Sequence, residues 1–344
     1  MKALAQGAFL RLEAWINRAL GKRLNPFYYL GAIAYFQLWI AVATGFYLYV
    51  FFETSVTAAH ASVESLTHAQ PWAGGIMRSL HRYASDGMVL AMLLHMLRHF
   101  TFGHHRGLRW FSWVSGVLLL VLVYVSGING YMLPWDRLAQ FVVTASTEWL
   151  DWLPLFKGAL ARNFLYAASV NDRFFSLLSF LHIGLPLGVL ALLWVHTQRV
   201  PKAQTNPPAP IAIGTGAMLL VLSIAKPALS HAPADLASVP QTLDLDWFYL
   251  APLPLAYEWG IAATWYAALG IGALLFAAPW IGKRSRAGDF AASVHPDERV
   301  LTVRAGETLL DAGLREGLPI PFDCRNGGCG DCKADLLAGR VRLN

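Results

Sequence analysis

Charged residues are scarce in this chain of 344 residues. They make up 14% of it and hydrophobic residues make up 56%, whereas a water-soluble domain usually carries about 25% charged residues. The sequence also lacks a Walker-type phosphate loop, a G-x-G-x-x-G motif, a nucleophile elbow and any nucleic-acid-binding motif. Nothing like a cleavable signal peptide precedes the first apolar stretch. The composition therefore predicts a protein embedded in a lipid bilayer, with no nucleic acid as partner.

Long uncharged stretches alternate with charged loops. Stretches that lack charged residues and approach the ~20 residues needed to cross a bilayer are 27–52, 110–132, 174–195 and 259–281. Two weaker candidates are 76–100, which contains several charged residues, and 211–225, which is shorter. The sequence thus predicts an all-α membrane domain with six transmembrane helices.

Basic residues collect in every second loop. They precede the first span, lie between the second and the third, and follow the fourth and the sixth, whereas the other loops mix acidic and basic residues. Because short basic loops stay on the cytoplasmic side, we expect both termini in the cytoplasm and the spans in a bacterial inner membrane. This orientation gives every span an inner and an outer end.

Two of the expected spans carry histidines at the same spacing. His81 and His95 are fourteen residues apart, and so are His182 and His196. Fourteen residues return a helix to nearly the same face, about 21 Å further along. We therefore expect His81 level with His182 near the outer surface and His95 level with His196 near the cytoplasm. Two such pairs suit two bis-histidine b haems; the alternative for a single histidine is a hydrogen-bonded core residue.

Glycines repeat at the same interval in the first and third spans. Gly31 and Gly45 are fourteen residues apart, as are Gly116 and Gly130. Glycine lets a flat macrocycle approach the backbone closely, although glycines in membrane helices also mark contacts between helices. By depth, we expect Gly45 and Gly130 to flank the outer haem, and Gly31 and Gly116 to flank the inner haem.

Charged residues within the second span need partners. Arg78 and Arg98 each lie three residues from a histidine of the expected pairs, and an arginine in lipid is costly without an anion nearby. We expect both to bind haem propionates; the alternative is that they extend to lipid headgroups. Asp86 lies one turn after Arg82, which favours a plain ion pair, with a proton relay as the alternative.

The stretch 27–281 resembles the haem-bearing part of cytochrome b from the quinol-oxidising cytochrome bc complexes. The resemblance rests on the repeated H-x13-H and G-x13-G pairs, the R-x-x-H ending at His81, the segment GYMLPWD (130–136), and Pro186 four residues after His182. It implies a four-helix bundle around two b haems, electron transfer across the membrane, and quinone sites near each face.

The sequence departs from this family at the outer quinol site. The family has a Pro-Glu-Trp-Tyr motif there, and the corresponding stretch here is LDWFYL, 245–250. The resemblance implies that Asp246 replaces the glutamate that takes a quinol proton, with a side chain one methylene shorter. The alternative is an ordinary belt of interfacial aromatic residues.

The only three cysteines lie near the C-terminus. Cys324, Cys329 and Cys332 form a C-x4-C-x2-C pattern. This spacing is typical of plant-type 2Fe–2S sites, which take four thiolates, whereas zinc sites usually combine two C-x2-C pairs or use histidine. With a strand expected at 300–303 and a helix at 307–315, the segment resembles the first half of a plant-type ferredoxin, a small α+β (β-grasp) domain. We expect the fourth ligand to come from downstream sequence; the alternatives are a ligand donated by a partner and a site that binds no cluster.

These features predict four parts, namely a cytoplasmic segment 1–26, a di-haem transmembrane domain 27–282, a linker 283–293 and a partial ferredoxin domain 294–344. We expect a subunit of a quinone/quinol oxidoreductase that moves electrons between a cytoplasmic 2Fe–2S centre, two b haems and quinone. We also expect a homodimer or larger complex, with flavin or nicotinamide modules as partners. One alternative is the quinol-oxidising core of a cytochrome bc complex, with a Rieske protein and a c-type cytochrome. The other is a haem conduit without a substrate pocket.

Overall fold

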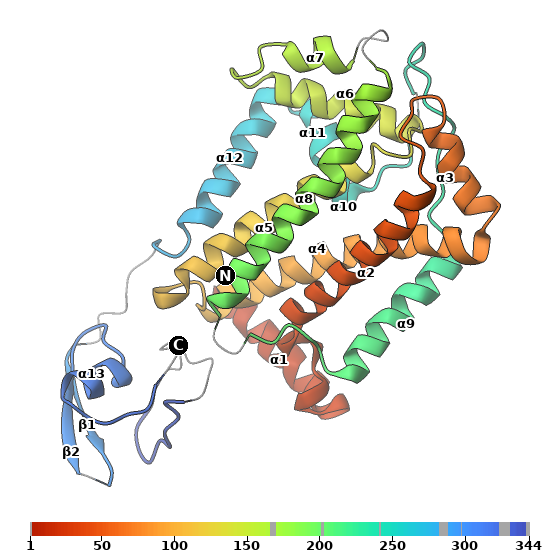
Figure 1. Ribbon diagram of the computed structural model, residues 1–344. Helices are drawn as coiled ribbons and strands as arrows, with labels where there is room; N and C mark the ends of the chain where they lie inside the picture. Colours follow the sequence, from red (N-terminus) through yellow and green to blue (C-terminus); the bar gives the residue numbers. More distant parts are fainter. Residues whose placement is uncertain are drawn as a thin grey trace.

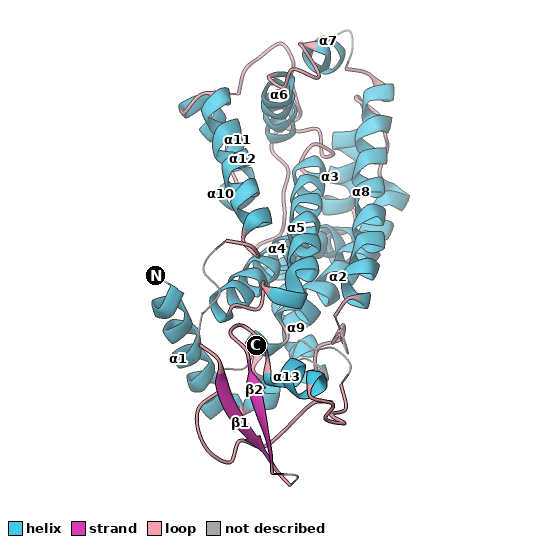
Figure 2. Cartoon of the chain, turned by 90° about the vertical axis from the view of Figure 1, so that its left-hand side faces the viewer, coloured by secondary structure: helices cyan, strands magenta, loops and turns pink. Residues whose placement is uncertain are grey.

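The computed structural model describes residues 2–165, 170–200, 203–240, 242–281, 288–296, 298–322 and 331–341. Over these residues the chain is mostly helical, with one two-stranded sheet (Figures 1 and 2). The helices and strands are α1 (Lys2–Leu20), α2 (Leu30–Phe51), α3 (Ala59–His68), α4 (Ile76–Phe102), α5 (Trp110–Gly130), α6 (Arg137–Asp151), α7 (Ala159–Phe164), α8 (Asp172–Gln198), α9 (Ala209–Ala225), α10 (Trp247–Leu250), α11 (Pro252–Glu258), α12 (Ile261–Ala277), β1 (Phe290–Val294), β2 (Arg299–Val303) and α13 (Leu309–Arg315). Short turns of other helix types are η1 (Lys22–Leu24), η2 (Pro26–Tyr28), η3 (Pro71–Gly75) and η4 (Gly107–Arg109).

All six expected spans are helices. Among the described residues, α2, α5 and α8 are long and apolar enough to cross a bilayer, and α9 and α12 are apolar helices of 17 residues each. The helix α4 is 27 residues long and carries the charged residues that weakened its prediction. Several apolar helices in one chain are the arrangement of a multi-pass membrane protein.

Four of these helices form a bundle. The helix α2 packs along α4, and α5 packs along α8, while α4 also contacts α5 (Figure 1). On α2 the buried residues include Leu30, Ala34, Leu38 and Ala41, whose spacing of three or four residues places them on one face. The helix α9 covers α4 from outside the bundle, and α12 contacts α5. We call the end of the bundle at His81 the outer end, and the other the inner end.

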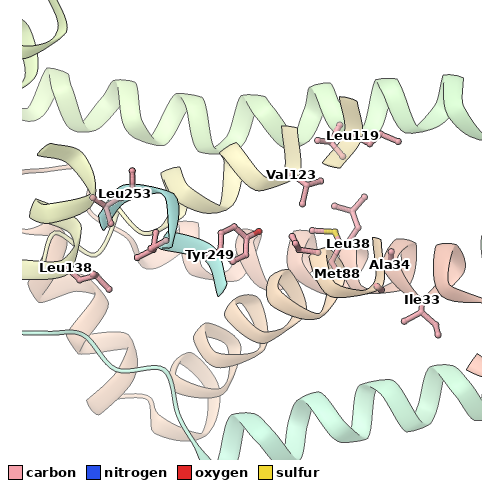
Figure 3. Packing of buried hydrophobic residues seen from close by; sticks show 14 of the residues in the cluster. Ile33, Ala34, Leu38, Met88, Leu119, Val123, Leu138, Tyr249 and Leu253 are labelled. Carbon is pink, nitrogen blue, oxygen red and sulfur yellow. The ribbon is translucent and has the colours of Figure 1, made fainter. Parts of the chain in front are cut away.

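A layer of apolar side chains fills the middle of the bundle. Leu38, Met88, Val123 and Val189, one from each bundle helix, are buried in a single hydrophobic cluster. Each lies seven residues from both members of the glycine or histidine pair on its own helix. Figure 3 shows the first three of them close together. This middle layer separates the two levels at which the histidines lie.

Hydrogen bonds hold the loop between α9 and α10 over the outer end of the bundle. Asp136 caps α6 by accepting a hydrogen bond from the Ala139 amide at 2.8 Å, and it accepts a second from the His231 amide at 2.8 Å. The Gln140 amide group donates to the carbonyl oxygens of Asp235 and Ser238, each at 2.9 Å. Because these contacts join segments about 95 residues apart, they fix the path of the loop.

The N-terminal segment is an ordered helix that packs against α4. Glu13 of α1 is buried and forms an ion pair with Arg98 at 2.7 Å. The amide group of Asn25 donates to the Glu13 carbonyl oxygen at 3.3 Å and to Oδ1 of Asn17 at 2.9 Å. These contacts hold α1 against the inner end of the bundle.

The C-terminal unit contains the expected strand and helix, as β2 and α13. The strands β1 and β2 pair in antiparallel fashion, with Phe290 opposite Val303, so that pairing begins inside the range expected as a linker. The hydroxyl of Thr308 accepts the Asp311 amide at 3.0 Å and caps α13. Gly317, the expected stop, has a φ of 76°, which is the left-handed conformation common after helices.

Candidate functional site

The outer pair of histidines brings α4 and α8 together. The rings of His81 and His182 have their centroids 6.0 Å apart. Nδ1 of His81 lies 2.8 Å from the Ala41 carbonyl oxygen, and Nδ1 of His182 lies 3.1 Å from that of Ser126. A ring nitrogen that faces a carbonyl carries the proton, so Nε2 of each ring is left to bind a metal. Metal–imidazole bonds are about 2 Å long, so two imidazoles on opposite sides of one iron have centroids roughly 6 Å apart, which fits this pair.

The inner pair lines a second cavity. His95 of α4 and His196 of α8 are both in its wall. Nδ1 of His196 lies 2.8 Å from the hydroxyl oxygen of Ser115, again leaving Nε2 for a metal. The ring of His95 packs against that of His99, with centroids 4.3 Å apart and ring planes tilted by 57°. The donor set at both levels is therefore paired imidazole, which suits haem iron.

Each of the four glycines of the repeat faces one of the four histidines. A Cβ added at each glycine would lie close to Cε1 of the facing ring, at 3.0 Å from His81 for Gly45, 2.9 Å from His182 for Gly130, 3.2 Å from His95 for Gly31 and 3.7 Å from His196 for Gly116. The structure thus brings together the same residues, level by level, that the spacing predicts. Without side chains at these positions, the rings have room beside the neighbouring helix.

Two cavities open at the two levels. The outer cavity has a volume of about 700 Å³, and the inner one about 420 Å³, both within the usual range for small-molecule sites. The outer cavity extends from the histidine pair to charged residues on α4 and beside α10, namely Arg78, Arg82, Asp86 and Asp246. The inner cavity is lined by the basic or imidazole side chains of His99, His104 and Arg109, besides its histidine pair.

A charged network lines the outer cavity. Nε of Arg82 donates to both carboxylate oxygens of Asp86, at 3.0 and 3.2 Å, which is the expected ion pair. The same guanidinium binds Oδ2 of Asp246 through Nη2. The hydroxyl of Tyr131 donates to this Oδ2 at 2.7 Å, and Arg82 lies over the Tyr131 ring, 4.3 Å from its centroid. One guanidinium therefore connects two carboxylates from distant parts of the chain.

Asp246 also caps the short helix α10. Its Oδ1 accepts the backbone amides of Phe248 at 2.9 Å and Tyr249 at 3.3 Å. Partial burial alone would raise the pKa of Asp246, but the hydrogen bond from Tyr131 and the charge of Arg82 outweigh it and hold that pKa below its usual value. The carboxylate is thus ionised and fixed at the cavity wall.

The two arginines expected at haem propionates lie in different surroundings. Arg78 lines the outer cavity and donates to Thr67 at 2.6 Å and Ser230 at 2.7 Å, with Glu64 at 3.4 Å. Arg98 is bound to Glu13 of α1, and in the described part of the chain it is not among the residues that line the inner cavity. The role in propionate binding stays a prediction for both arginines.

Several residues of the two cavities were not singled out from the sequence. Tyr249 is 1% exposed, and its hydroxyl forms no hydrogen bond within the described residues; its place in the LDWFYL segment was the available signal. The contact of Arg82 with Asp246 joins residues 164 positions apart, for which the sequence holds no local signal. His99 and His104 also line the inner cavity, and no motif in the sequence singled them out.

Two of the predicted cluster ligands, Cys324 and Cys329, lie outside the described residues. Cys332 is described, partly buried and not in a disulfide. Over the described ranges, no group of three or more histidine, cysteine or acidic side chains is arranged to hold a metal ion. The predicted 2Fe–2S site therefore rests on the sequence pattern.

Comparison with known proteins gives two family matches and a structural one. The family model described as cytochrome b/b6/petB matches residues 16–203, and the 2Fe-2S iron-sulfur cluster binding domain matches residues 293–344. A solved structure titled "Hyperthermophilic respiratory Complex III" is similar with a TM-score of 0.59 and 19% sequence identity, over 75% of this chain and 76% of that one. This likeness shows a shared fold. The chain belongs to the cytochrome b/b6/petB family, and its residues 293–344, which follow the membrane helices, match the 2Fe-2S iron-sulfur cluster binding domain.

Proposed function

We propose that this protein is the electron-transfer subunit of a membrane quinone/quinol oxidoreductase. Membership of the cytochrome b family implies haem, and the second family match implies a 2Fe–2S cluster, which makes the chain a membrane redox subunit. The observation that carries the finer proposal is the outer cavity, whose wall connects the His81–His182 pair with the carboxylate of Asp246. An apolar cavity with a few fixed polar groups is the usual form of a small-molecule site.

In this proposal the chain holds two b haems, one between His81 and His182 and one between His95 and His196. When bound, each haem supplies reversible one-electron transfer. The protein orients His81, His182 and His196 through the partners of their Nδ1 atoms. It leaves space beside all four imidazoles at the glycines. The apolar middle layer keeps water out of the region between the two levels.

Quinol or quinone occupies the outer cavity in this proposal. Asp246 is the group that receives a quinol proton, because its carboxylate lines the cavity and Tyr131 and Arg82 hold it in one orientation. A general base must lie within hydrogen-bond reach of the proton that it takes. The exposed face of this carboxylate meets that requirement for a ring hydroxyl that enters the cavity.

The wider arrangement follows from the distribution of charge in the sequence. We place both termini in the cytoplasm and the spans 27–282 in a bacterial inner membrane, with 294–344 as a partial ferredoxin domain after the linker 283–293. The cluster held by Cys324, Cys329 and Cys332 then exchanges electrons with the inner haem. Flavin or nicotinamide modules are the proposed soluble partners, in a homodimer or larger complex.

The test of this function is reduction of the haems by a quinol. Purified, haem-loaded protein mixed with decylubiquinol in a stopped-flow instrument should show haem reduction, with a rate that saturates as quinol concentration rises. Saturation is expected because quinol binds in a site before it reacts. Haem reduction by dithionite but not by any ubiquinol or naphthoquinol would contradict the proposal and support the haem conduit.

A second candidate is the quinol-oxidising core of a cytochrome bc complex. The observation that favours it is the likeness in fold to the structure titled as a respiratory Complex III. In that case a Rieske protein and a c-type cytochrome would be partners at the outer face. Purification of the native complex decides between the two, because a stoichiometric Rieske subunit would establish the second candidate.

A further inference from the structure

We propose that Asp86 is a second proton-binding carboxylate of the outer cavity, and that it holds the proton which Asp246 receives. This inference rests on the proposed function, in which quinol occupies the cavity. It assigns a role to a membrane-embedded acid that the resemblance to cytochrome b leaves without one. The supporting observations are the charge of the network, the unequal number of hydrogen bonds to its two carboxylates, and a buried hydroxyl beside them.

The network has more negative than positive charge. Within the described residues, the guanidinium of Arg82 is the one cation bound to both Asp86 and Asp246, so the three ionised side chains carry a net charge of −1. Two carboxylates that share one partner in an apolar environment bind a proton more readily than an isolated carboxylate does, because each disfavours ionisation of the other. Uptake of one proton makes the network neutral.

The proton is held on Asp86 because Asp246 accepts more hydrogen bonds, which its protonation would weaken. Asp246 accepts four hydrogen bonds, from Arg82, Tyr131 and the amides of Phe248 and Tyr249. Within the described residues, Asp86 accepts hydrogen bonds from Nε of Arg82. Hydrogen bonds to a carboxylate stabilise its ionised form, so protonation of Asp246 would cost more than protonation of Asp86.

A buried, unpartnered hydroxyl indicates that the same part of the cavity takes a polar ligand. The hydroxyl of Tyr249 forms no hydrogen bond with the described residues, and Tyr249 lines the outer cavity together with Asp86. Figure 3 shows its ring extending from α10 into the space between α4 and α5. Burial and, next, the Asp86 carboxylate raise the pKa of Tyr249, so this hydroxyl remains a donor. A buried donor without a partner in the protein is a suitable contact for a ring oxygen or a water.

The charged and tyrosine groups around Asp86 come from α4 itself, from the ends of α5 and α9, and from α10. They are Arg82 and Tyr83 on α4, Tyr131 after α5, Lys226 at the end of α9, and Asp246 and Tyr249 at α10. The helix α2 contains no charged residue. The side chain of Asp86 is 24% exposed, and this surface faces the cavity, so a proton can reach it.

The transfer balances with the reactants of the proposed function. The O–H bond of a quinol hydroxyl breaks, and its proton passes first to Asp246. The proton then moves through the cavity to Asp86, where an O–H bond forms on a carboxylate oxygen. One electron would leave the quinol together with this proton, and a ferric b haem held by His81 and His182 would be its acceptor. Arg82 stays protonated throughout and remains bound to Asp246.

Infrared spectroscopy of the haem-loaded protein without quinone tests the proton site itself. The acid-minus-alkaline difference spectrum should contain a carboxylic C=O band that is lost in Asp86→Asn. The band should remain in Asp246→Asn with its midpoint at lower pH, because a nearby negative charge has been removed. Asp244→Asn is the matched control, since Asp244 lines the same cavity in an exposed position, and it should leave the band unchanged. A band that persists in Asp86→Asn would overturn the proposal.

Kinetics with decylubiquinol test the role in the reaction separately. Asp86→Asn should slow haem reduction by about 10²-fold, the lower range for loss of an acid–base group. In wild-type protein the rate should fall at acid pH, because Asp86 is then already protonated, and Asp86→Asn should abolish this fall. Asp86→Glu should restore most of the rate, because it restores a carboxylate. A wild-type rate and pH profile in Asp86→Asn would overturn the role. If wild-type protein shows no quinol oxidation while the infrared band is lost in Asp86→Asn, the proposed function fails and the proton site stands.

Discussion

The two ends of the bundle have the same arrangement of histidines and glycines, but the other residues that line their cavities differ. At both ends, a histidine of α4 and a histidine of α8 lie beside glycines of α2 and α5. The outer cavity is lined in addition by Asp86, Arg82 and Asp246, whereas imidazole and basic side chains line the inner cavity. The repeat therefore accounts for the cofactor binding proposed at both ends, and the residues that differ between the two cavity walls account for the different chemistry proposed at each end.

The largest expected effect is loss of a single haem. In His95→Leu the inner pair loses one imidazole, so haem content should fall from two to one per chain and the outer haem spectrum should remain. His81→Leu should give the converse result. A pyridine haemochrome assay measures the content, and His60→Leu, in α3 away from both pairs, is the control. Loss of both haems in each variant, with the control intact, would show that the two levels do not bind haem independently.

The next largest effect concerns a residue that lines the outer cavity. Asp246→Asn removes the charge proposed to receive a quinol proton, so decylubiquinol-driven haem reduction should slow by about 10²-fold. Haem content should not change, because Asp246 contacts neither histidine of the outer pair by any hydrogen bond in the described structure. Glu258→Gln is the control, because Glu258 is exposed on α11 and is not among the described residues that line the outer cavity. Unchanged kinetics in Asp246→Asn would return LDWFYL to an interfacial aromatic belt and favour quinone chemistry at the inner end.

Substitutions of glycine test whether the histidines are packed more closely at the outer end than at the inner end. A Cβ at Gly130 would lie 2.9 Å from Cε1 of His182, but one at Gly116 would lie 3.7 Å from Cε1 of His196. Gly130→Ala should therefore displace the outer imidazole and shift the midpoint potential of the outer haem, whereas Gly116→Ala should leave the inner haem unchanged. Gly188→Ala, where nothing lies within 4 Å, is the control. Equal effects of the first two in a potentiometric titration would contradict this packing.

The smallest effect is a pH dependence at the inner end. Burial, together with the charges of Arg109 and Arg98, lowers the pKa of His104 to about 4. Because the unfolded chain binds this proton more readily, His104 favours unfolding as pH falls from about 6.5 towards about 4. Acidification should therefore lower the melting temperature of wild-type protein more than that of His104→Gln. Circular dichroism at about pH 7.5 and about pH 5 measures both, and equal losses would show that His104 is not buried in this way.

The features that depend on helical periodicity and on apolar stretches could be predicted from the sequence. Fourteen residues are close to four helical turns, so the spacing of the histidines and glycines, together with the orientation expected for the spans, was enough to place His81 opposite His182. The apolar stretches also located the spans to within a few residues, for example α2 at Leu30–Phe51 against the expected 27–52.

The remaining contacts depend on the paths of the loops. The pairing of Arg82 with Asp246 requires the α9–α10 loop to return over the outer end, where Asp136 and Gln140 hold it. The pairing of Arg98 with Glu13 requires α1 to pack on α4. No periodic pattern encodes such contacts between distant segments, because they are determined by tertiary packing. For this reason the contacts of Arg82 with Asp246 and of Arg98 with Glu13 became visible only in the structure.

The claim on which the comparison depends is that each end of the bundle binds one b haem. A pyridine haemochrome assay on purified wild-type protein, with chain concentration from quantitative amino-acid analysis, tests it most directly. The account predicts two b haems per chain, because two independent imidazole pairs are present. One haem per chain, or none, would contradict it.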